Sequence, residues 1–73
     1  MPHIVVKMKA GRTEEMKQKL AASLTAAMTS ALGVPDSAVS IAILDVAPER
    51  WNAEVYEPEI RAKMDTLYRK PGY

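Results

Sequence analysis

The pattern of apolar and polar positions predicts a strand followed by a long helix. Residues 2–8 are rich in β-branched side chains, which predicts a strand, and Pro2 is acceptable as its first residue. Beyond the turn at residues 9–12, apolar residues recur every four positions, as they do along one side of a helix. This stripe consists of Met16, Leu20, Leu24, Met28 and Leu32. Thr13 is the expected N-cap of the helix, and Gly33 is expected to end it.

The second half of the chain predicts one more strand and a short helix. Residues 39–46 are almost continuously apolar, which is typical of a strand covered on both faces. A strand, helix and strand in this order predict a βαβ unit with parallel strands and a right-handed crossover. Residues 48–51 predict a turn, and a second helix is expected from about Pro58 to Arg69, with Pro58 in its first turn. The expected fold class is therefore α/β (α+β), a single βαβ unit plus a short C-terminal helix.

The small size of the chain predicts self-association. Its 73 residues allow one domain, spanning residues 1–73, and such a chain buries only about 60% of its unfolded surface on folding. It has no cysteine and one histidine, so we expect no disulfide and no metal site. Two parallel strands do not form a stable sheet alone, and each leaves an open edge. We therefore expect a symmetric homodimer that completes the sheet, and leave open whether dimers assemble further.

Charge and composition argue against two classes of partner. Ten Lys and Arg residues balance nine Asp and Glu residues, for a formal net charge of +1, and the basic residues form no run. A nucleic-acid binder would normally show a basic stripe or a stacking platform. No apolar stretch approaches the roughly 20 residues of a membrane span, and we expect no signal peptide, since Met1-Pro2-His3 lacks a basic segment before an apolar one. We expect a cytoplasmic protein with neither nucleic acid nor membrane as its partner.

The candidate chemistry centres on Pro2, because the chain has no cysteine, no Ser-His-Asp arrangement and no glycine-rich phosphate loop. We expect Met1 to be removed, which would make the Pro2 nitrogen a secondary amine. An α-amino group has an ordinary pKa of about 7.7 to 8.0. An apolar pocket and a nearby cation lower that pKa, so that a neutral amine can act as a general base. Arg12 is the candidate cation and Trp51 the candidate apolar wall.

Several short motifs occur together in the chain. They are Pro2 behind the initiator, Ile4-Val5-Val6-Lys7, Gly11-Arg12-Thr13-Glu14-Glu15 with Lys17, and Val34-Pro35 leading to Val39. This set resembles the 4-oxalocrotonate tautomerase superfamily. Residues 48–51, 59–60 and 70–73 are similar to its short dimeric phenylpyruvate-tautomerase-like (PptA-type) branch. The resemblance implies a tautomerase (MIF-like) fold whose sheet is completed by dimerisation.

The resemblance also implies an activity, that of a cofactor-independent enol–keto tautomerase, an isomerase. In that family the amino-terminal proline moves a proton between the enol oxygen and a carbon of a 2-oxo acid. By the same resemblance, Arg12 would bind a carboxylate and Trp51 would close an apolar pocket. Ser40, a candidate pocket hydroxyl, stands where the family has a second arginine. We therefore expect a small monocarboxylate substrate such as phenylenolpyruvate, and expect a dicarboxylate such as 2-hydroxymuconate to react poorly.

Strand length predicts a site shared between subunits. Seven strand residues span roughly 20 Å, so Pro2 and Arg12 cannot meet within one chain. An antiparallel partner would bring Pro2 of one subunit to Arg12 and Trp51 of the other, giving two equivalent sites per dimer. His3 should point to the face opposite Pro2, as a surface or packing residue.

The sequence leaves three alternatives open, one for the second cation of the site and two for the function. Arg50 or Arg61 could supply the positive charge that Ser40 lacks. A hydratase or dehalogenase of the same superfamily would need a carboxylate that activates water, for which Glu54 is close to the family's position without matching it. A dimeric ligand-binding module without catalysis would keep the fold and lose the chemistry.

Overall fold

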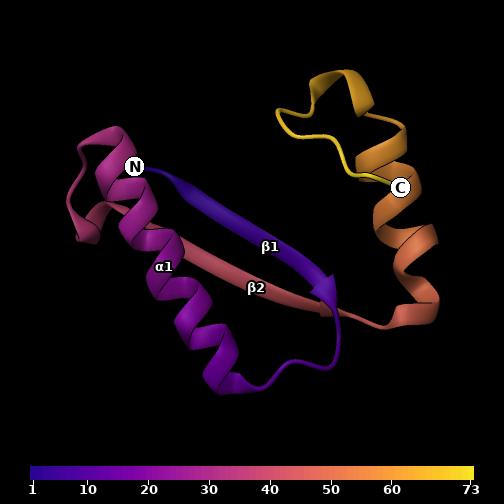
Figure 1. The fold of residues 1–73 in the computed structure, drawn as a ribbon, viewed down its shortest axis with the longest axis horizontal. Coiled ribbons are helices and arrows are strands. Elements are labelled where there is room, and N and C mark those ends of the chain that lie inside the picture. Colours follow the sequence, from indigo (N-terminus) through magenta and orange to yellow (C-terminus); the bar gives the residue numbers. More distant parts are fainter.

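A strand, a long helix and a second strand follow one another along the first two thirds of the chain (Figure 1). In the computed structural model, which describes residues 1–73, β1 spans His3–Lys9, α1 spans Glu14–Leu32 and β2 spans Ser40–Val46. The two strands are parallel, and their register runs from His3 beside Ser40 to Lys9 beside Val46. The predicted βαβ unit is therefore confirmed.

Both ends of α1 are capped by the residues that the sequence suggests. The Thr13 side chain accepts a hydrogen bond from the Met16 main-chain nitrogen at 3.2 Å, which satisfies one of the free N–H groups of the first turn. At the other end, Gly33 adopts a left-handed conformation with φ of 69°, which glycine reaches without a steric penalty. Its N–H donates to the Thr29 carbonyl oxygen at 3.0 Å.

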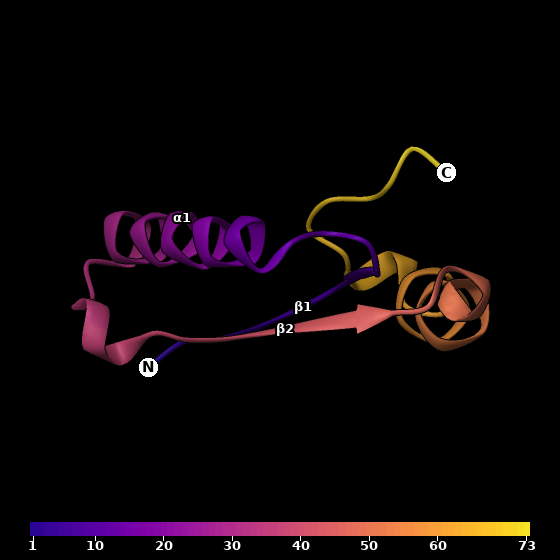
Figure 2. The same ribbon diagram turned by 90° about the horizontal axis from the view of Figure 1, so that it is seen from below.

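The helix covers one face of the sheet and leaves the other open (Figure 2). Alternate β1 residues from Ile4 to Met8 are half-buried on the covered face, beside Ile41 and Ile43 of β2. On the open face, Val5 and Leu44 remain 49% and 45% exposed. The sequence predicts that β2 is covered on both faces. Within a single chain, only one face of β2 is covered. The covering of its second face by another subunit stays a prediction.

The apolar stripe of α1 follows the sheet only over its middle. Leu20, Leu24 and Met28 are half-buried, whereas Met16 and Leu32 are 53% and 58% exposed. Although Met16 belongs to the predicted stripe, it is therefore not part of the core of the single chain. At 3.6 residues per turn, each four-residue step overshoots a full turn by about 40°, so the stripe winds away from the sheet at its ends. Neither α1 nor any other helix is long and apolar enough to span a membrane.

A helical arm stands beyond the carboxyl ends of the strands (Figures 1 and 2). It consists of a 3₁₀ turn η2 at Pro48–Arg50, a π-helix η3 at Asn52–Arg61 and a 3₁₀ turn η4 at Met64–Thr66. Val55 of η3 is 5% exposed and is the only buried residue of the chain. The ion pair between Lys7 and Glu59 links β1 to this arm.

The predicted boundaries of the C-terminal helix, from Pro58 to Arg69, are wrong. The helical conformation begins at Trp51, directly after η2, and η3 contains Pro58 in its interior. Its hydrogen bonds include the wide step from the Ala62 nitrogen to the Glu57 oxygen at 3.0 Å. The ring of an interior proline clashes with the carbonyl four residues earlier in an α-helix, and a π-turn gives that ring more room. Tyr68, which lies within the predicted helix, is fully exposed.

The single chain exposes more surface than a folded monomer of its size. Its accessible surface is 5559 Å². A folded monomer of 8.0 kDa is expected to expose about 4,450 Å². The radius of gyration is 13.8 Å, where a chain of this length would ordinarily show about 11 Å. The excess of roughly 1,100 Å² is surface that a second copy of the chain can cover.

Candidate functional site

An open cavity of about 590 Å³ lies where the two strands end and the helical arm begins. Its walls come from the end of β1 and the turn after it, from η2 and η3, and from the last residue of the chain. The lining residues are Met8, Lys9, Arg12, Pro48, Trp51, Asn52, Tyr56 and Tyr73.

The parallel strands bring Arg12 and Trp51 to this cavity. Since the carboxyl ends of parallel strands lie at the same edge of a sheet, the segments that follow β1 and β2 meet there. A hydrogen bond from the Ala10 nitrogen to the Val46 oxygen at 2.9 Å holds these two segments together. Gly11, with φ of 131°, turns the chain toward Arg12 in a conformation that glycine tolerates best. On the other side, η2 carries the chain from β2 to Trp51.

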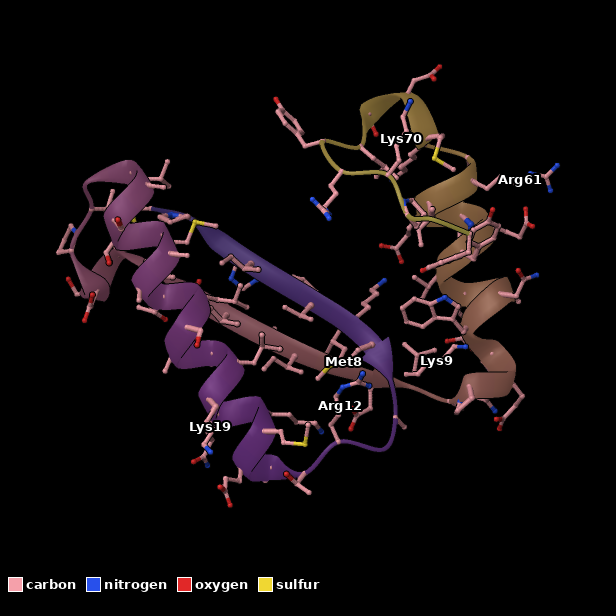
Figure 3. All side chains as sticks on the ribbon, in the orientation of Figure 1. Met8, Lys9, Arg12, Lys19, Arg61 and Lys70 are labelled. Carbon is pink, nitrogen blue, oxygen red and sulfur yellow. The ribbon has the colours of Figure 1, made fainter.

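The cavity holds two cationic side chains and no Asp or Glu side chain. Arg12 and Lys9 both line it, and no Asp or Glu does. The Arg12 Nη1 atom donates a hydrogen bond to the Lys9 main-chain oxygen at 3.3 Å. Figure 3 shows Lys9 and Arg12 near one another at the end of β1, with Met8 beside them. This end of the molecule therefore presents positive charge to anything that enters the cavity.

Charged residues that the sequence offered as alternatives lie elsewhere. Arg50 pairs with Glu54 at 3.9 Å, and Arg61 pairs with Glu57 at 3.1 Å. None of these four residues lines the cavity. The structure therefore brings neither Arg50 nor Arg61 to Arg12, and it gives the cavity no carboxylate at Glu54 to activate a water molecule.

Aromatic side chains form much of the remaining wall. Trp51, Tyr56 and Tyr73 all line the cavity, and the rings of the two tyrosines lie 5.8 Å apart, tilted by 36°. The sequence pattern did not indicate Lys9, Asn52, Tyr56 or Tyr73 as residues of the site. The five-residue step from Trp51 to Tyr56, one hydrogen-bonded turn of a π-helix, is a signal that could have indicated Tyr56. Tyr73 reaches the cavity only because the end of the chain folds back, which no local pattern shows.

Pro2 and Ser40 lie together at the opposite end of the sheet. The Ser40 nitrogen donates to the Pro2 oxygen at 3.2 Å, so the two residues are neighbours across the strands. The Ser40 hydroxyl forms a hydrogen bond of 2.6 Å with Nδ1 of His3, which is exposed. One chain therefore brings Pro2 to Ser40 and Arg12 to Trp51, and the length of the sheet separates the two pairs.

The sequence matches a known family model. The model for the tautomerase enzyme family matches residues 2–57. The chain belongs to the tautomerase family, and it is an isomerase.

Individual relatives agree with this assignment over most of the chain. A probable tautomerase from Xylella fastidiosa is 45% identical over 73 residues, which cover 100% of this chain and 89% of the relative. The tautomerase PptA of Pectobacterium carotovorum is 42% identical, with 100% of this chain and 97% of the relative covered. Among solved structures, a 4-oxalocrotonate tautomerase isozyme from Methylibium petroleiphilum superposes with a TM-score of 0.67 at 38% identity, over 68% of this chain and 81% of that one. The resemblance to the 4-oxalocrotonate tautomerases and to the PptA-type branch is confirmed.

Proposed function

We propose that this isomerase is an enol–keto tautomerase of small 2-hydroxyenoic and 2-oxo monocarboxylic acids, for example phenylenolpyruvate. In this proposal Pro2 is the general acid and base once Met1 has been removed, and Arg12 and Trp51 bind the substrate. Ser40, whose main chain is hydrogen-bonded to Pro2 and whose hydroxyl is hydrogen-bonded to His3, flanks the Pro2 end of the site. The observation that carries the proposal is the cavity at the carboxyl ends of the strands, where Arg12 and Trp51 meet, with Pro2 at the other end of the same sheet.

The proposed active unit is a symmetric homodimer. Two antiparallel copies of the sheet would place the amino end of β1 in one subunit beside the cavity of the other. Each site would then combine Pro2 and Ser40 of one subunit with Arg12 and Trp51 of its partner. The excess surface of roughly 1,100 Å² per chain supports a partner, since about 800 Å² per subunit is the size of a standard stable interface.

The proposed reaction is a proton relocation that conserves every atom. The neutral Pro2 amine takes the proton from the enol hydroxyl, the oxygen becomes a carbonyl, and the carbon–carbon double bond accepts the same proton at C3. The Arg12 guanidinium holds the substrate carboxylate throughout, in a bidentate geometry that suits this group. Since no electron leaves the substrate, the step calls for no cofactor. A positioned acid–base group typically contributes about 10²- to 10⁴-fold to such a rate.

Two features of the proposed site keep the amine neutral. A cation beside an ammonium group disfavours the charged form, and burial against an apolar wall does the same. Arg12 and Trp51 of the partner subunit would supply both effects. In a chain that keeps Met1, the Pro2 nitrogen is an amide and has no basicity, so removal of Met1 is a requirement of the proposal.

The preference for one carboxylate follows from Ser40. A serine hydroxyl carries no charge and donates one hydrogen bond. A guanidinium at that position would carry a full positive charge and could donate two hydrogen bonds to one carboxylate. A second carboxylate on the substrate would thus lose its partner at the Pro2 end of the site. We propose a cytoplasmic location together with this small-molecule activity.

The test is the ketonisation rate of phenylenolpyruvate, measured on protein whose mass shows the loss of Met1. Pro2→Ala should lower the rate by at least about 100-fold, because the variant lacks the secondary amine that is the proposed general acid and base. Pro35→Ala, which changes a proline that is not one of the proposed site residues, is the matched control and should keep the wild-type rate. Full activity in Pro2→Ala would refute the role of Pro2. A wild-type rate equal to that of buffer would exclude phenylenolpyruvate as a substrate.

The two other functions that the sequence allows have less support than the tautomerase activity. A hydratase or dehalogenase requires a carboxylate that activates water, and Glu54 is engaged by Arg50 outside the cavity. A binding module without catalysis is disfavoured by the tautomerase family membership of the chain. The same experiment identifies a binding module. A protein that only binds its ligand would show no turnover in the wild type, and its Pro2→Ala variant would retain the ligand affinity.

A further inference from the structure

The cavity contains a cation to which the proposed mechanism gives no role. We propose that Lys9 binds the oxygen on C2 of the substrate while Arg12 binds the neighbouring carboxylate. Lys9 would then stabilise the negative charge that develops on this oxygen when its proton leaves. The substrate class in this inference rests on the proposed function, whereas the anion-binding role of Lys9 rests on the cavity itself.

The pairing of charges singles out Lys9 and Arg12. Of the ten Lys and Arg residues, five lie within 4.0 Å of a carboxylate oxygen: Lys7, Lys17, Lys19, Arg50 and Arg61. Among the other five, only Lys9 and Arg12 line the cavity. Figure 3 shows Lys19, Arg61 and Lys70 away from Lys9 and Arg12, on α1, on η3 and near the end of the chain. Both cations of the cavity are therefore without an Asp or Glu partner.

Two like charges in one cavity favour an anionic ligand. Each cation raises the energy of the other, and an anion placed between them removes this cost. The hydrogen bond from Arg12 to the Lys9 main chain keeps the guanidinium near the base of the Lys9 side chain. Because the two residues are tied together at the end of one strand, both charges can reach adjacent groups of a single small ligand.

The chemistry of the two side chains assigns their roles. A guanidinium is a planar fork that matches the two oxygens of a carboxylate. An ammonium group is a compact point charge with freely rotating donors, which suits a single oxygen. A 2-hydroxyenoic acid presents one of each on adjacent carbons. Donors aimed at the atom where charge develops lower the barrier more than they strengthen ground-state binding.

The experiment compares Lys9→Met, which keeps the length of the side chain and removes its charge, with Lys9→Arg, which keeps the charge. Lys70→Met is the matched control outside the cavity. In the ketonisation assay, Lys9→Met should lower kcat/KM by about 100-fold, with part of the loss in kcat, as for removal of one oxyanion donor. Lys9→Arg should recover most of that loss, and Lys70→Met should match the wild type.

Binding measurements separate this inference from the proposed function. By calorimetry, Lys9→Met should weaken phenylpyruvate, which has an oxygen on C2, by about 10-fold, the loss of one charge-assisted hydrogen bond. It should leave 3-phenylpropanoate, which lacks that oxygen, unchanged. Equal affinity of wild type and Lys9→Met for phenylpyruvate would overturn the assignment of Lys9 whether or not the protein turns over phenylenolpyruvate. Equal weakening of both ligands would assign Lys9 to the carboxylate and overturn its assignment to C2.

The tyrosine pair carries a second inference independently. We infer that Tyr56 and Tyr73 bind the tail of the substrate and select a planar aromatic group. Their rings are 5.8 Å apart, within the range of favourable aromatic pairs, and both line the cavity with Trp51. Tyr73 is 69% exposed, so its ring has a large free surface at the cavity that a ligand ring can cover. The last segment of the chain returns to η3 and places Tyr73 there (Figure 1).

Tyr73→Ala tests this inference, and Tyr68→Ala, which removes a fully exposed tyrosine, is the matched control. The readout is the ratio of the affinities for 3-phenylpropanoate and propanoate, which differ only in the ring. Trp51 is the sole tryptophan and lines the cavity, so its fluorescence reports binding without catalysis. Tyr73→Ala should lower the ratio by about 3- to 10-fold, the value of one aromatic contact. An unchanged ratio, or an equal fall in Tyr68→Ala, would overturn the inference.

Discussion

Two inactive variants of this protein should restore activity to each other when their subunits mix. Pro2→Ala removes the proposed base, and Arg12→Ala removes the proposed carboxylate ligand. The residues lie at opposite ends of a seven-residue strand, a separation of roughly 20 Å, so the shared-site proposal takes them from different subunits. A mixed dimer would then contain one site with both native groups and one site with neither.

The size of the recovery follows from counting subunits. Random association of equal amounts makes about half of the dimers mixed, so about one quarter of all sites regain both groups. Each variant alone should retain at most about 1% of the wild-type rate. Ketonisation of phenylenolpyruvate should therefore rise about 25-fold on mixing, to about one quarter of the wild-type activity per chain.

The assay requires exchange of subunits and a measure of its extent. The two variants are unfolded together, refolded and examined by native mass spectrometry, which resolves the mixed dimer by mass. The matched control mixes Pro2→Ala with the double variant Pro2→Ala/Arg12→Ala, whose mixed dimers contain no native site and should stay inactive. If mixed dimers form and the activity remains the average of the two parents, each site belongs to one chain and the reasoning from strand length is wrong.

Three further predictions follow from the fold. The Tm should rise with protein concentration, because the proposed dimer would bury much of the uncovered surface of roughly 1,100 Å²; a Tm that is constant over a 100-fold range in calorimetry would exclude this. Thr13→Ala should reduce the free energy of unfolding by about 1 kcal/mol, since it removes the hydrogen bond to the Met16 nitrogen, and should lower the Tm by about 4–8 °C; an unchanged melt in circular dichroism would contradict the capping role. Ser40→Arg should raise kcat/KM for 2-hydroxymuconate relative to phenylenolpyruvate, because it adds a positive charge beside Pro2; an unchanged ratio would show that Ser40 does not decide between mono- and dicarboxylates.

The helix and strands were predictable because their signals are local. The cap at Thr13, the stop at Gly33 and the β-branched run of β1 each depend on contacts within a few residues. The C-terminal helix was placed wrongly for the same reason. Proline favours the first turn of an α-helix, so Pro58 by itself predicts the start of a helix. The structure instead has a π-helix that starts at Asn52 and contains Pro58 in its interior.

The candidate site was predictable only in part. Arg12 and Trp51 could be placed together, because parallel strands bring their carboxyl ends to one edge. The contribution of Tyr73 could not, since it depends on how the last segment folds back over the cavity. The sequence also offered Arg50 and Arg61 as a second cation, and only the structure shows that both have carboxylate partners away from the cavity.

The sequence by itself determined the order of elements, the parallel βαβ unit, the ends of α1 and the residue types that suit proton transfer. These features depend on hydrogen bonds and burial over short distances along the chain, which periodicity reveals. The tertiary structure decided that Lys9, and neither Arg50 nor Arg61, accompanies Arg12 in the cavity, and that Ser40 lies beside Pro2. The pairing of Arg50 and Arg61 with carboxylates of the arm leaves Lys9 as the cation beside Arg12. The register of the sheet joins Ser40 to Pro2, two residues far apart in the chain.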